Sequence, residues 1–117
     1  MKMYIGIRQE DGALSVTVNG KPLNPRLDLW NHSPTGFECG YGGSGPAQLA
    51  LALLAEHLNN DERAVALHQC FKRSVVAGLS PKGWRLTSDQ IERSLQTLET
   101  VRRSERAEES ACVHAVE

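Results

Sequence analysis

The sequence predicts an α+β fold, in which a small antiparallel sheet of about three to four strands packs against about three helices. Two segments near the start, residues 3–8 and 14–18, are rich in β-branched and aromatic residues and flank a turn sequence, which predicts a β-hairpin. Between residues 46 and 98, apolar residues recur at helical spacing. Strands followed by helices are typical of an antiparallel sheet that is covered on one face.

Further extended segments are expected after the hairpin. Asn19 and Gly20 form a turn signal, so a short strand is expected at residues 21–23. Residues 26–30 alternate leucines with polar or bulky side chains, which predicts a half-buried strand. The long loop at 31–45 contains a possible brief strand at 37–39.

The first helix is expected to begin at the end of this loop. Ser44 is a residue type that favours the N-cap, and Pro46 suits the first helical turn because its missing N–H bonds nothing there. Residues 49–55 are apolar on all sides of a helix. This pattern predicts the buried centre of the domain.

A second helix is expected from a cap at Asp61 to about Val76, with Gly78 as its C-cap. In a third helix, Thr87 and Gln90 have the spacing of a capping box.

The domain organisation follows from the C-terminal composition. Residues 82–86 form a short extended segment before the third helix. Residues 99–117 are polar and lack a periodic apolar face. We therefore predict one α+β domain at 1–98, followed at 99–117 by a frayed helix end and a disordered polar tail.

Composition excludes several classes of protein. The 117 residues carry a net charge of −1, which argues against a protein that coats nucleic acid or anionic membrane. No apolar run is long enough for a membrane span, and the N-terminus lacks the apolar core of a signal peptide, so we expect a cytoplasmic protein. Cys39, Cys70 and Cys112 share no metal-binding spacing. We therefore expect neither a metal nor a cofactor.

Residues 40–45, GYGGSG, match the letters of a dinucleotide-binding motif. That motif needs a βαβ unit with an acidic residue at the end of the second strand, and this sequence offers none. Three interpretations stay open: structural glycines, a partner contact, or an anion site at the helix N-terminus. The residues of the anion site would be Gly42, Gly43, Ser44 and Gly45.

The run RLDLWNHSPTGFECGYGGSGPAQLALALLAEHL, with the later FKRSVVAGL and GWRLTSDQI, resembles a small uncharacterised domain family. The resemblance covers about residues 1–96. Members of that family occur in bacteria, phages, plasmids and integrated mobile elements. The resemblance implies a compact accessory domain of mobile DNA, where inhibitors of host defence systems are common.

The residues favour a binding protein over an enzyme, because no nucleophile elbow or metal motif is present. The main hypothesis is a non-catalytic protein-interaction module, and the resemblance narrows it to an inhibitor of a bacterial defence complex of the anti-CRISPR type. Its aromatic anchors would be Trp30, His32, Phe37 and Tyr41.

Two alternatives remain. One is a small-ligand or nucleotide-phosphate binder, possibly an enzyme, which uses the glycine-rich loop and the helix N-terminus. The other is a weak nucleic-acid binder. Its contacts would be Lys72, Arg73, Lys82 and Arg85.

Overall fold

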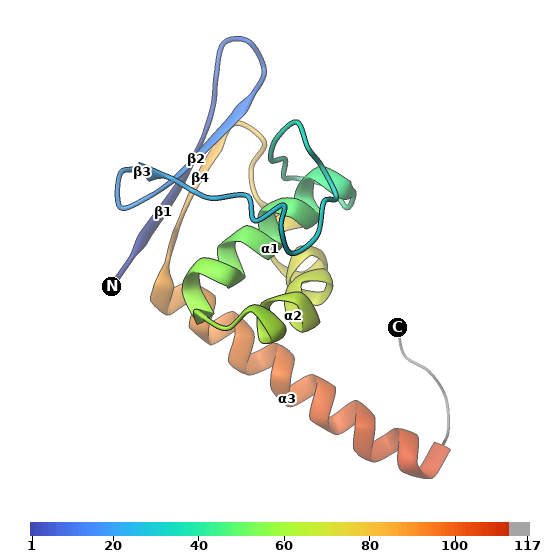
Figure 1. The fold of residues 1–117 in the computed structure, drawn as a ribbon. Helices are drawn as coiled ribbons and strands as arrows, with labels where there is room; N and C mark the ends of the chain where they lie inside the picture. Colours follow the sequence, from blue (N-terminus) through green and yellow to red (C-terminus); the bar gives the residue numbers. More distant parts are fainter. Residues whose placement is uncertain (113–117) are drawn as a thin grey trace.

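In the computed structural model, a four-stranded antiparallel sheet packs with one face against helices, which confirms the predicted α+β fold (Figure 1). The structure describes the backbone of residues 1–112 and the side chains of residues 1–100. The strand order is β3-β2-β1-β4. In chain order, the elements are β1 (Met3–Arg8), β2 (Leu14–Val18), β3 (Lys21–Pro22), α1 (Ser44–Leu58), α2 (Asp61–Ser74), the 3₁₀ helix η1 (Val76–Gly78), β4 (Gly83–Thr87) and α3 (Ser88–Cys112).

The central strand β1 joins the predicted hairpin to the late strand β4. Tyr4 of β1 lies between Val18 of β2 and Leu86 of β4, and these three side chains face the helices. Gly6 pairs with Trp84, whose indole ring occupies the space that a Cβ on Gly6 would need. The glycine therefore allows a large aromatic ring to lie flat on the central strand.

Helix α1 is buried on all sides through most of its length, as its apolar run predicts. Every residue from Gly45 to Ala55 is buried. Its leucines form one core with Tyr4 and Val16 of the sheet and with Phe71 of α2. An enclosed helix of this kind places its few polar side chains in contact with other protein groups, because no water reaches them.

The predicted strand at 26–30 is wrong, because these residues form a turn. Arg26 adopts a left-handed conformation with φ of 56°, and its backbone N–H donates to the Asn24 side chain. The Arg26 guanidinium binds the carboxylates of both Asp28 and Asp61 at 3.0–3.2 Å. These contacts hold a conformation that alternation of leucines could not reveal. The brief strand expected at 37–39 is a single bridge from Phe37 to Leu14.

Two predicted helix caps are displaced by one residue. The N-cap of α1 is Gly43, and Ser44 is the first helical residue, without a capping hydrogen bond. The N-cap of α2 is Asn60 rather than Asp61, because the Asn60 side chain accepts from the backbone N–H of Arg63. Asn and Asp are equally favoured at the N-cap, so residue type alone did not distinguish Asn60 from Asp61.

The ends of the later helices also refine the predictions. Helix α2 ends at Ser74, and Gly78 lies in η1 rather than serving as its C-cap. The capping box is confirmed, since Thr87 and Gln90 exchange side-chain to backbone hydrogen bonds of 2.9 and 3.1 Å. Helix α3 continues to Cys112, and the last part of the tail predicted at 99–117, residues 113–117, lies outside the described residues. Within the described chain, no helix is both long and apolar enough to cross a membrane.

Candidate functional site

The glycines at 40–45 allow close packing around the start of α1. Gly40 has a φ of 86° and donates its N–H to the carbonyl of Val76. Gly43 lies under the Tyr41 ring, and a Cβ there would come within 2.8 Å of that ring. Gly40 needs glycine for its backbone conformation, whereas a Cβ on Gly43 would only displace the half-exposed Tyr41 side chain.

Gly45 allows the preceding loop to lie directly on α1. A Cβ on Gly45 would be 2.7 Å from the Cβ of Glu38. Glu38 is itself held by a bidentate ion pair with Arg8, with both bonds at 2.9 Å. Gly42, in contrast, has open space around it and no positive φ. The structural interpretation therefore accounts for Gly40 and Gly45, and it does not require glycine at positions 42 and 43.

Gln48 is the polar side chain that fixes the loop before α1. It is completely buried, and its amide nitrogen donates to the carbonyls of Pro25 and Trp30 at 2.6 and 3.0 Å. Its amide oxygen accepts from the backbone N–H groups of His32 and Ser33 at 2.7 and 3.1 Å. These four bonds use the whole hydrogen-bonding capacity of the amide. They hold residues 25–33 in one conformation against α1.

Trp30, His32 and His68 form what we call the aromatic–histidine cluster. The Trp30 and His32 rings stack with centroids 5.0 Å apart and an interplanar angle of 11°. The Nε2 atoms of His32 and His68 are 2.9 Å apart, and the Nδ1 of His68 is 2.7 Å from the Val65 carbonyl. A carbonyl only accepts, so Nδ1–H of His68 donates to it, and in the neutral ring Nε2 of His68 carries no proton. His32 therefore donates its Nε2–H to His68.

The surroundings of the two histidines favour neutral rings. Burial lowers the pKa of His32, and the positive charge of Lys72 lowers it further. Burial also lowers the pKa of His68, which is only 1 % exposed, against the opposing effect of the bond to Val65. Both rings therefore resist protonation near neutral pH.

The two imidazoles meet tip to tip. Their centroids are 5.1 Å apart, so the 2.9 Å between the Nε2 atoms and the two ring radii account for almost the whole separation. Two ligands of one metal ion would instead direct their lone pairs to a common third point. Among the side chains that the structure describes, no three His, Cys, Asp or Glu residues gather as a metal site.

The four predicted anchors lie in different surroundings. Trp30 and Tyr41 are 50 % and 52 % exposed. His32 is half-buried in the aromatic–histidine cluster, and half-buried Phe37 packs against the core. Two further residues belong to the site: His68, which completes the aromatic–histidine cluster, and Gln48, which holds the loop. Neither was predicted from the sequence to be functional. Whether the anchors contact a partner stays a prediction.

Residues 4–97 match DUF6166, a family of unknown function. The chain belongs to this family. The DUF6166 match includes the whole of the aromatic–histidine cluster, Gln48 and the glycine-rich segment. No curated protein and no solved structure matches the chain.

The cations predicted to bind nucleic acid in this DUF6166 chain come from separate elements. Lys72 and Arg73 lie in the last turn of α2. Lys82 precedes β4, and Arg85 pairs with Ile5 on the sheet face that points away from the core. The role of these residues stays a prediction, as does the anion site at the start of α1.

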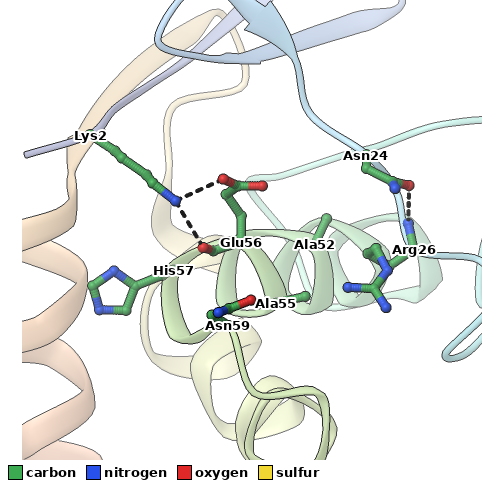
Figure 2. A pocket seen from close by; sticks show the side chains of 8 residues that line it. All are labelled: Lys2, Asn24, Arg26, Ala52, Ala55, Glu56, His57 and Asn59. Carbon is green, nitrogen blue, oxygen red and sulfur yellow. Dashed lines mark hydrogen bonds and ion pairs between the residues drawn. The ribbon is translucent and has the colours of Figure 1, made fainter.

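A polar pocket of about 360 Å³ lies in the DUF6166 domain beside the second half of α1 (Figure 2). Its floor includes Ala52 and Ala55, and Lys2 and Arg26 contribute cations to its wall. Lys2 binds the Glu56 carboxylate at 2.8 Å, and Arg26 binds two aspartates. Because acidic side chains already neutralise both cations, the pocket does not favour a phosphate.

Proposed function

We propose that this chain is a non-catalytic protein-binding module, with Trp30 as its central contact residue and Tyr41 as a second anchor. The observation that carries the proposal is that Gln48 fixes the loop around Trp30. A buried amide places all four of its hydrogen bonds on the loop that presents a half-exposed indole. Tryptophan is highly buried on average, and it is among the residues most enriched in binding hot spots.

Rigid presentation favours binding. A loop that is already ordered loses little conformational entropy when it meets a partner. The stacked His32 ring supports one face of Trp30, so the indole keeps its orientation. The Tyr41 ring lies over Gly43, which has no side chain to displace it. Both anchors thus offer large area at a small entropic cost.

The narrower form of the proposal is that the partner is a bacterial defence complex. It is supported by the resemblance of the segment around Trp30 and Gln48 to proteins of phages and mobile elements.

The test is to purify the tagged chain from bacterial cells and quantify proteins that copurify in stoichiometric amounts. Trp30→Ala is expected to weaken the interaction by about 2 kcal/mol, or roughly 30-fold, as for a hot-spot residue. Leu27→Ala, a control at an exposed apolar residue of the adjoining turn, is expected to retain the partner. Equal recovery with wild type and Trp30→Ala would reject the proposed function, provided that both proteins have the same melting temperature.

A further inference from the structure

The hydrogen bond between His32 and His68 depends on protonation. It needs one bare Nε2, and that atom belongs to His68 because Nδ1–H of His68 is committed to the Val65 carbonyl. A proton added to Nε2 of His68 would leave two N–H groups pointing at each other across 2.9 Å. The closed arrangement therefore cannot hold both rings in the charged state.

From this geometry we propose that protonation of the His32–His68 pair gates the contact surface at Trp30. At neutral pH the pair is closed, meaning that the His32 ring is bonded to His68, and Trp30 is presented with His32 stacked against it. The bonds of Gln48 do not titrate, so they hold the loop backbone in both states. In acid, both rings are charged, His32 leaves His68, and Trp30 loses the support of its stacked neighbour. This inference rests on the proposed function of Trp30, and it adds the regulation of that same surface.

The charges around the pair favour separation of the two rings once the rings are protonated. Lys72, one helical turn beyond His68 on α2, disfavours a positive charge on either ring. Each charged imidazole also repels the other. On the loop side, His32 packs against the uncharged Trp30 ring, and on the α1 side the neutral Gln48 holds the His32 backbone. None of these contacts supplies a carboxylate that would stabilise the doubly charged pair.

The sign of the pH dependence follows. The pKa of each histidine is lowered while the two rings are in contact, so the open state, in which they are apart, binds more protons. The closed form therefore has its full stability above the ordinary histidine pKa of about 6.5 and loses stability as the pH falls below it, through the lowered pKa values. Each further pH unit favours opening by about tenfold for every extra proton bound.

The experiment is an NMR titration of the full chain from pH 7.5 to pH 5, without any partner. The signals are the indole N–H of Trp30, the indole N–H of Trp84 and the imidazole protons. We expect the Trp30 signal to shift in a transition steeper than a single protonation. The Trp84 signal should stay constant, since its Nε1 is buried in the core and reports only global unfolding.

Matched variants identify the group responsible. His68→Gln should abolish the steep Trp30 transition, because an amide does not titrate. His57→Gln changes another histidine, which is paired with Glu92, and should leave the transition intact. A Trp30 signal that stays constant to pH 5, or one that shifts identically in His68→Gln, would overturn the gate.

The gate and the proposed function can fail separately. If Trp30→Ala abolishes copurification of a partner but the titration shows no transition, then only the gate is wrong. If the titration shows the transition but the partner is retained by Trp30→Ala, then the gate exists and the surface at Trp30 is not the binding site.

Discussion

Gln48→Leu is the substitution that most directly tests how the loop is held. Leucine keeps approximately the size of the glutamine side chain but removes all four hydrogen bonds to residues 25–33. Each bond contributes about 0.5–1.5 kcal/mol net, so the simple sum is about 2–6 kcal/mol. If the loop lifts from α1, water can bind the freed backbone groups. We therefore expect a loss of about 2–4 kcal/mol.

The assay is urea unfolding followed by circular dichroism, with the free energy extrapolated to water. Gln9→Leu is the control, since the Gln9 side chain is exposed and makes a single long bond of 3.4 Å to the Ile7 carbonyl. That variant should change stability by less than about 0.5 kcal/mol. If Gln48→Leu were no more destabilising than Gln9→Leu, the loop would not depend on the buried amide, and the case for a rigid binding surface would fail.

Three further predictions concern the packing around α1. Gly45→Ala should destabilise by about 1–3 kcal/mol because its Cβ meets that of Glu38, whereas Gly42→Ala should be almost neutral; thermal melts of both variants decide this. Leu53→Ala should cost about 2–5 kcal/mol in urea unfolding by leaving a core cavity, and a smaller loss would show that α1 is not enclosed. The Arg8 hydrogen bonds lower the pKa of Glu38, so the ionised Glu38 side chain stabilises the fold fully above about pH 4.3, and this stabilisation is lost as the pH falls through the folded pKa. Glu38→Gln should flatten this part of the dependence of the unfolding free energy on pH.

Periodicity predicted the elements whose burial is regular. The hairpin, the enclosed helix α1 and the capping box of α3 all follow from local patterns that the tertiary structure reinforces. The error at 26–30 has a physical cause, because Asp61 lies 35 residues away and holds Arg26 through a long-range ion pair. No local pattern can include that contact.

The candidate site was only partly predictable. Trp30 and His32 stand out as an aromatic and a titratable residue in a long loop, but their pairing with His68 depends on how α2 lies against that loop. Gln48 did carry a signal, as the polar residue of the run from Gly45 to Ala55. A buried amide must find partners, so its presence indicated that a backbone segment would lie against α1.

The enclosure of α1 has a consequence for hydrogen exchange. A helix without a solvent-facing side cannot open alone, because its release would expose the core shared by the sheet and α2. Its amide protons are therefore expected to exchange only through global unfolding. At neutral pH, Gln48 extends this protection to the backbone N–H groups of His32 and Ser33, which lie in a surface loop. Most loops exchange quickly, but these two amides should exchange much more slowly than other loop amides.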